Sequence, residues 1–356
     1  MDTNEILLQR AGRLGHIILN RPKAINALND SMIAAITAAL QEWATDDGVE
    51  TVLLSGAGER GLCAGGDIVA IYRHIQAGAD KEVFWEDEYR MNSLISRYPK
   101  PIVALMDGVV LGGGIGLSAH ASHRVVTERT TVGMPETRIG FIPDVGGCFL
   151  YSRAPGELGT HLGLTAGTGT GADAILLGLA DYFVDSADLP ELAAALADAP
   201  ADEAIARFAR KEVPASGLEK ERLWIDACYA YDDAEEILAA LQESGEPNAR
   251  EAAAELAAKS PTSVKLTLEA LRRARRMDTL EEVLDQDYRL GIRLLAAPDF
   301  AEGVRAQVID KDRNPKWKPA TLAEVDRGTV ESYFAGLGED ELGLSSAQMP
   351  AGRTKA

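Results

Sequence analysis

Two hydrophobic patterns divide the first part of the chain into strands and helices. Short, uninterrupted apolar runs, typical of buried strands, occur in residues 49–56, 100–108 and 123–129. Apolar residues at helical spacing occur in residues 29–48, 67–78, 81–99 and 112–122. Two more apolar runs around a glycine-containing turn in residues 5–22 predict a β-hairpin. Strands that alternate with helices in this way predict an α/β fold.

Beyond about residue 200 the pattern changes. Segments such as 234–244, 249–260 and 280–297 repeat apolar residues at helical spacing, and clear strand patterns are absent. We therefore expect three parts. These are an α/β core over residues 1–199, a mostly α-helical region over 200–338 and a small, polar, flexible tail over 339–356.

Composition narrows the class of protein. The formal net charge of −19 disfavours nucleic acid and anionic membranes as partners, because both are polyanions. Cys63, Cys148 and Cys228 lie far apart without a CxxC pair, so neither a disulfide framework nor a thiolate zinc site is expected. The first ten residues lack the pattern of a secretory signal, and no uncharged apolar run approaches the length of a membrane span. We expect a cytoplasmic location.

Two glycine-rich loops each follow a predicted strand and enter a predicted helix. One has the sequence CAGGD at residues 63–67, and the other has LGGGIGL at residues 111–117. Glycine permits close backbone approach to a ligand, and the unpaired amides at a helix start suit an oxyanion. One N–H from each loop would form a minimal oxyanion hole. The alternative is an ordinary turn with an Asp67 cap in the first loop and close helix packing in the second.

Two carboxylates, Glu136 and Asp144, lie at the ends of an apolar segment, and each directly follows a proline. Helix capping explains their positions, since Glu136 suits a first helical turn and Asp144 suits the N-cap of the next helix. A catalytic pair explains the apolar surroundings, because burial raises a carboxyl pKa towards the working range of an acid–base catalyst. The residue types alone leave both interpretations open.

The remaining motifs give weaker evidence of function. The sequence GAGERG at residues 56–61 fits GxGxxG, but no helix opens at its third glycine, so a plain loop is favoured over a dinucleotide site. His120 and His123 lack further ligands at suitable spacing, and no metal site is expected. There is no GxSxG motif for a serine hydrolase. The arginines of RRARR at residues 272–276 are interpreted as one solvated helix face.

The order of these motifs resembles the crotonase, or enoyl-CoA hydratase/isomerase, superfamily. The segments that carry the resemblance are LNRPKAINALN, GLCAGGDI, GVVLGGGIGLSAH and MPETRIGFIPDVGG. The resemblance covers roughly residues 5–335 and implies a spiral of ββα units followed by helices. It further implies an acyl-CoA substrate, no cofactor apart from the CoA of that substrate, and, by analogy, assembly into a homo-oligomer.

The resemblance also implies roles for individual residues. The oxyanion amides fall on Gly66 and Gly113, and the catalytic carboxylates on Glu136 and Asp144. Glu88 matches a further acid that contacts the substrate, although a surface acid in a charged helix is the alternative. A CoA channel would be lined by Lys23, Ala24 and Ala64.

One position separates the branches of the superfamily. Hydratases carry a second glutamate three residues after the oxyanion glycine, and this chain has Gly116 there. Together with the C-terminal segment DFAEGVRAQVIDKDRNPKWKP, this resembles the branch that hydrolyses short β-hydroxyacyl-CoA thioesters such as 3-hydroxyisobutyryl-CoA, in valine breakdown. Two alternatives stay open: a hydratase or isomerase with Glu136 as sole base, and a non-catalytic acyl-CoA-binding protein.

Overall fold

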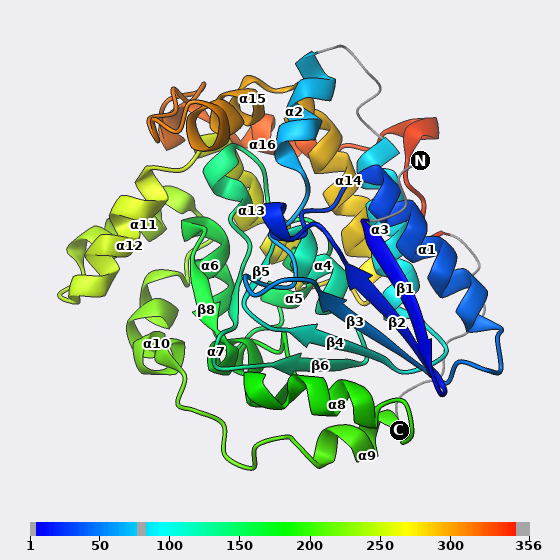
Figure 1. The fold of residues 1–356 in the computed structure, drawn as a ribbon. Coiled ribbons are helices and arrows are strands. Elements are labelled where there is room, and N and C mark those ends of the chain that lie inside the picture. The colour runs from blue at the N-terminus through cyan, green and yellow to red at the C-terminus, as the bar shows by residue number, and fades with distance from the viewer. Residues whose placement is uncertain (1–4, 77–82, 347–356) are drawn as a thin grey trace.

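The α/β core consists of two β-sheets surrounded by helices (Figure 1). This computed structural model describes residues 5–76 and 83–346. Parts of two predicted helices (77–82) and the end of the predicted tail (347–356) lie outside the described residues. The strands are β1 (Ile6–Ala11), β2 (Leu14–Leu19), β3 (Thr51–Gly56), β4 (Ile102–Met106), β5 (Val109–Leu111), β6 (His123–Val126), β7 (Thr131–Gly133), β8 (Thr168–Thr170) and β9 (Tyr182–Phe183).

Helices cover both sheets and form most of the chain beyond residue 185. Among the described residues none is long and apolar enough to cross a membrane. They are α1 (Asp30–Ala44), α2 (Ile68–Gln76), α3 (Val83–Ser96), α4 (Gly113–Ser118), α5 (Gly147–Tyr151), α6 (Leu158–Thr165), α7 (Gly171–Leu176), α8 (Leu189–Ala195), α9 (Ala201–Ala206), α10 (Gly217–Cys228), α11 (Ala234–Glu243), α12 (Pro247–Ala257), α13 (Pro261–Ala274), α14 (Leu280–Ala296), α15 (Pro298–Val304) and α16 (Arg327–Tyr333). Short helical turns include η1 (Pro22–Ala24), η2 (Glu136–Ile139) and η4 (Arg305–Ile309).

The strands of the larger sheet are ordered β1-β2-β3-β4-β6-β9, and those of the smaller sheet β5-β7-β8. The predicted hairpin is confirmed, since β1 pairs antiparallel with β2. The remaining neighbours in the larger sheet are parallel. Successive residues of a strand in this sheet point to two different hydrophobic cores. Val52 and Leu54 of β3 face the larger core with α1, α3 and α4, whereas Leu53 faces a smaller core under α8 and α9.

The chain repeats one unit as it passes between the sheets, which confirms the predicted spiral. A strand of the larger sheet is followed by a short extended piece at the smaller sheet and then by a helix. Strands β4 and β5 lead to α4, and β6 and β7 lead to η2. Strand β3 leads to α2 through bridges from Gly61 to Gly108 and from Cys63 to Val110, beside β5. Corresponding loops of three successive units therefore lie next to one another.

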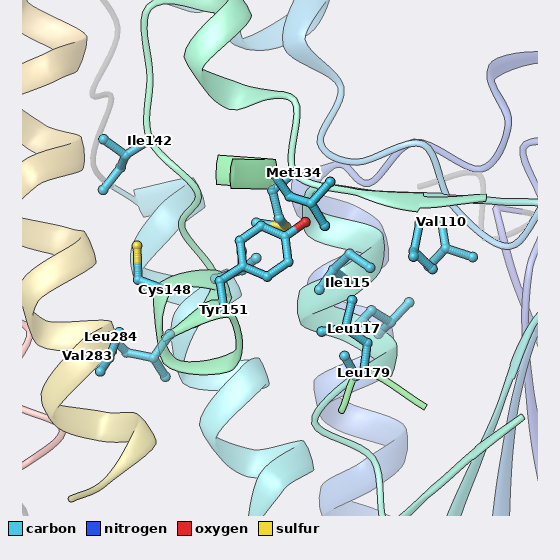
Figure 2. Close-up of a cluster of buried hydrophobic side chains, with 14 of the residues drawn as sticks. Val110, Ile115, Leu117, Met134, Ile142, Cys148, Tyr151, Leu179, Val283 and Leu284 are labelled. Atoms are coloured by element: carbon cyan, nitrogen blue, oxygen red, sulfur yellow. The ribbon is translucent and has the colours of Figure 1, made fainter. Parts of the chain in front are cut away.

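The helical C-terminal region shares one hydrophobic core with the spiral. Figure 2 shows Tyr151 of α5 beside Met134, with Ile115 and Leu117 of α4 near them. Residues of α14 such as Leu284 belong to the same buried cluster. Residues 341–346, which the sequence assigned to the tail, pack against α14. Leu342 and Leu344 are buried there, and the Leu344 and Ser345 amides donate to Asp285.

The interpretation of residues 272–276 as a solvated face is wrong for Arg272. Its side chain is 11% exposed and pairs with Glu157 and Asp232. It also donates to the carbonyl groups of Tyr229 and Tyr231, just beyond the end of α10. A guanidinium with five donors suits such a position, because it can satisfy carbonyl groups at a helix C-terminus as well as acids.

Candidate active site

A small, mostly apolar cavity of about 180 Å³ lies where the three corresponding loops meet α3 and α15. Its aromatic wall is continuous: the ring centroids of Trp85 and Phe141 are 5.8 Å apart, and those of Phe141 and Phe300 are 5.6 Å apart. The volume is below the roughly 300–1,000 Å³ of sites for drug-sized ligands, so the cavity suits a small acyl group. Its polar lining comes from Glu88, Glu136, Asp144, Arg138 and the glycine loops.

Gly66 and Gly113 lie side by side at the cavity. A methyl group at position 113 would lie 3.4 Å from the Gly66 nitrogen. Neither glycine N–H has an acceptor among the described residues. Their neighbours Gly65 (φ +106°) and Gly112 (φ +51°) have backbone conformations that favour glycine, which brings the two loops close together. Two unbonded donors beside one cavity have the arrangement that an oxyanion hole for a single carbonyl oxygen requires.

Glu136 begins η2, directly after the smaller sheet and Pro135. It is the acid of the first turn of η2, and its Oε2 is buried without a partner. A Cβ on Gly112 would lie 2.6 Å from Glu136 Oε1, so glycine at 112 leaves the space that the carboxyl group occupies. Burial raises the pKa of Glu136 well above its usual range, and the charge of Asp144 raises it further. The first-turn position predicted for Glu136 is confirmed, but that position does not account for a buried oxygen without a partner.

Capping by the Asp144 side chain is contradicted. Helix α5 begins at Gly147, and it is the backbone carbonyl of Asp144 that accepts from the Gly147 N–H. The carboxylate instead lines the cavity and accepts a hydrogen bond of 2.6 Å from the hydroxyl of Tyr89. Burial raises the pKa of Asp144 to about 6, while the bond from Tyr89 acts to lower it. Such a value is close to the working range of an acid–base group at neutral pH.

Glu88 lies on α3 and is 3% exposed, so the alternative of a surface acid is wrong. Its carboxyl group lines the cavity, and Oε1 is buried without a partner. Oε1 lies 2.5 Å from the position that a Cβ on Gly113 would occupy. Burial, and then the charge of Asp144, raise the pKa of Glu88 well above its usual range. Glu88, Glu136 and Asp144 thus line the same cavity as Gly66 and Gly113.

The three residues expected along a CoA channel fall in two places. Ala64 lines the cavity, and its N–H donates to the carbonyl of Ile25 at 2.9 Å. Lys23 and Ala24 lie in the exposed turn η1, outside the cavity. The backbone bond from Ala64 to Ile25 thus joins the cavity loop to the end of this turn.

Gly116 is buried, and side chains lie where its Cβ would be. A Cβ at this position would lie 2.6 Å from the Cβ of Val145 and 3.0 Å from Nδ2 of Asn92. A glutamate side chain has no room there unless the neighbouring backbone moves. Asp144, from the next loop, lines the cavity beside Glu136.

Sequence reasoning missed several residues of the site. Tyr89 directly follows Glu88 but carried no pattern of its own. Asp287 of α14 is fully buried and accepts a 3.0 Å bond from the Gly146 N–H. Asp287 is more than 140 residues from the loop that it contacts, and no sequence spacing links the two. Among the described residues, no group of three or more His, Cys, Asp or Glu side chains is arranged to hold a metal ion.

This chain is similar to known proteins that have different names. The chain is 41% identical over 352 residues to the mitochondrial 3-hydroxyisobutyryl-CoA hydrolase of Danio rerio, covering 96% of this chain and 92% of that protein. It is 37% identical over 365 residues to a small ribosomal subunit protein of Neurospora crassa, covering 94% and 72%. The crystal structure of a carnitinyl-CoA dehydratase from Mycobacterium thermoresistibile has a TM-score of 0.92 and 49% identity, covering 96% and 99%.

The family is decided by the extent of these matches. The sequence model for enoyl-CoA hydratase/isomerase matches residues 14–334, which is nearly the whole described chain. The fold, the paired glycine loops and the acids beside them are those that the sequence resemblance implied. This chain belongs to the enoyl-CoA hydratase/isomerase family.

Proposed function

We propose that this protein hydrolyses the thioester of 3-hydroxyisobutyryl-CoA to 3-hydroxyisobutyrate and CoA. The observation that carries the proposal is the pair of unbonded N–H groups of Gly66 and Gly113 beside buried acids, in a cavity sized for a short acyl group. The curated relative from Danio rerio is named for this hydrolysis and matches over nearly its whole length. Coenzyme A enters as part of the substrate, and no separate cofactor is proposed.

In this proposal the thioester oxygen accepts from both glycine N–H groups. These donors are fixed before the reaction, so they stabilise the negative charge that develops on the oxygen in the transition state. Glu136 either attacks the carbonyl carbon to form a mixed anhydride, which water then cleaves, or activates a water for direct attack. In both routes the C–S bond breaks, one water is consumed, and the CoA sulfur leaves and takes up a proton. Asp144 takes and returns that proton.

The remaining acid and the exposed turn would bind the substrate. Glu88 would bind the β-hydroxyl group, since its buried Oε1 lacks a partner inside the protein. The pantetheine arm would pass Ala64, and the nucleotide would reach the turn that holds Lys23 and Ala24. Binding of these parts adds no chemistry but positions the carbonyl group over Gly66 and Gly113.

Gly116 argues against hydration as the main reaction. Addition of water to a double bond would be served by two glutamates, and the structure leaves no room for the second at position 116. Hydration or dehydration is the second candidate, because the similar structure from Mycobacterium thermoresistibile is named a carnitinyl-CoA dehydratase. A non-catalytic role is the third candidate, since one relative is named as a ribosomal protein. Buried, unpaired acids oppose that role, because they lower stability without serving packing.

Thiol release should depend on pH through a buried carboxylate. Burial raises the pKa of Asp144 to about 6, and catalysis needs the ionised form. We therefore expect kcat/KM for hydrolysis of 3-hydroxyisobutyryl-CoA to fall with decreasing pH, with an apparent pKa of about 6 or higher. Rates of free-thiol release between about pH 5 and about pH 8 would show it. If the decrease of kcat/KM at low pH instead has an apparent pKa near that of an exposed carboxyl group, a buried catalytic acid is contradicted.

The biological setting is a further part of the proposal. 3-Hydroxyisobutyrate is a product of valine breakdown, so the proposed reaction places the enzyme in that pathway. A cytoplasmic location and a homo-oligomer stay predictions, and the Danio rerio relative is named as mitochondrial.

A further inference from the structure

We propose that Tyr89 is a positioning residue that holds Asp144 in place and keeps it the ionised member of the buried acids. This inference rests on the proposed function. Tyr89 is fully buried and is not part of the cavity lining. It therefore acts on the reaction only through Asp144.

The contact between the two side chains is short and confined. The Tyr89 hydroxyl donates to Asp144 Oδ2 at 2.6 Å, within the range of about 2.5–2.7 Å for an O–H bonded to an ionised oxygen. The Tyr89 ring packs edge-on against Tyr288, with centroids 6.5 Å apart. Gly291 of α14 lies beside the hydroxyl, since a Cβ there would be in van der Waals contact with it at 3.7 Å. The ring is thus held between α3 and α14 with its hydroxyl directed at Asp144.

Asp144 is surrounded by acids from three elements. Glu88 comes from α3, Glu136 from η2 and Asp287 from α14, and the thiol of Cys148 on α5 is also close. Each of these three acids has one buried oxygen without a partner: Glu88 Oε1, Glu136 Oε2 and Asp287 Oδ1. Asp144 differs because it receives the hydroxyl of Tyr89, and the Trp85 side chain acts on its pKa in the same direction.

Positive charge does not compensate these acids. Among the described residues that line the cavity, Arg138 is the only cation. Its side chain is 45% exposed, lies 4.0 Å from Glu255 and donates to the carbonyl of Ala166. Like charges at close range do not all ionise. Asp144 receives side-chain donors from both Tyr89 and Trp85, whereas Asp287 receives one backbone N–H, so Asp144 is the acid that retains the negative charge. The other three have their pKa raised well above the usual range, chiefly by burial.

Asp287 stabilises the turn that follows Asp144. Its Oδ2 accepts from the N–H of Gly146, two residues after Asp144. Val145 and Gly146 have φ of +48° and +76°, an unusual turn that directs the Asp144 side chain towards the cavity. With Asp144 anionic, the proton of Glu136 or of the attacking water has an acceptor, and that proton later goes to the departing CoA sulfur.

The test is the pH profile of Tyr89→Phe. Loss of a hydrogen bond to a charged group should move the acid limb of kcat/KM upwards by about one to two pH units. Activity above that limb should return close to the wild-type value, and KM should change little. Tyr98→Phe is the matched control, since Tyr98 loses a comparable 2.7 Å bond to the carbonyl of Leu40, away from the cavity. Its limb should not move.

Three results would overturn the inference. They are an unmoved limb in Tyr89→Phe, a downward shift, which would mean that the limb follows Glu136, and an equal loss at every pH, which would indicate a merely structural role. If Tyr89→Phe does not fold, a ring-fluorinated tyrosine at position 89 keeps the shape and strengthens the donor, so its limb should move downwards. Absence of thiol release in the wild type would instead sink the proposed function.

Discussion

Replacing Glu136 by glutamine is expected to lower kcat/KM for thioester hydrolysis by about 10²- to 10⁴-fold, the usual range for loss of an acid–base group. Glutamine keeps the shape of the side chain beside Gly112 but neither attacks the carbonyl carbon nor takes a proton. Free thiol released from 3-hydroxyisobutyryl-CoA measures the effect. Glu86→Gln is the control. The Glu86 side chain is 40% exposed and pairs with Arg90 one turn further along α3.

The same substitution should not destabilise the fold. The pKa of Glu136 is raised in the folded state, so the folded protein binds its proton more tightly than the unfolded chain does. The free energy of unfolding of the wild type therefore falls as pH rises above the unfolded value. Glutamine does not ionise, so the variant does not lose this stability as pH rises. At about pH 8 the variant should have a Tm equal to or above that of the wild type. If Glu136→Gln releases free thiol at the wild-type rate, Glu136 is not the catalytic acid, and Asp144 is the next residue to test.

Adding one methyl group at Gly113 is expected to lower kcat by about 10²- to 10³-fold, as loss of one oxyanion donor does. The methyl group would lie 2.5 Å from Glu88 Oε1 and 3.4 Å from the Gly66 nitrogen. It therefore intrudes where the thioester oxygen must reach both N–H groups. The closest atom it meets is the end of a side chain, which can move, so the fold should survive. Thiol-release kinetics and a thermal melt would separate the two effects.

Gly66→Ala is the matched control for this change. A methyl group at position 66 would meet Phe84 and Ile71 at 3.4–3.6 Å, an ordinary van der Waals distance. Its effect on kcat should be much smaller than that of Gly113→Ala. Equal losses in the two variants, or no loss in either, would contradict the arrangement of the oxyanion hole.

Local sequence patterns were sufficient for the strands and helices of the α/β core, whereas its spiral arrangement followed from the family resemblance. Continuous apolar runs became β3, β4 and β6 because their alternate residues are buried in two different cores, so no polar face was needed. Helix α1 begins at Asp30, within the predicted segment 29–48, and Asn29 caps it by accepting from the Met32 N–H at 3.0 Å. The glycine loops were recognisable because several of their glycines adopt positive φ or bring two backbones into contact.

Long-range contacts were beyond these patterns. Arg272 looked solvated because a run of arginines usually is, yet it is held by acids and carbonyl groups from other helices. Glu88 lies in a charged helix, and only the packing of α3 against the glycine loops shows that it is buried. The roles inferred for Tyr89 and Asp287 depend on contacts across more than 50 and 140 residues. A pattern of neighbouring residues carries no information about such pairs.

The most direct test of the central claim compares two reactions of the purified wild-type protein. Free-thiol release from 3-hydroxyisobutyryl-CoA is measured beside the hydration of crotonyl-CoA at the same enzyme concentration. The proposed function, with Glu136 and Asp144 at the oxyanion hole and no acid at Gly116, predicts rapid thiol release and hydration near background. Rapid hydration with thiol release at background would contradict the hydrolase and favour the second candidate, while background rates in both would favour the non-catalytic one.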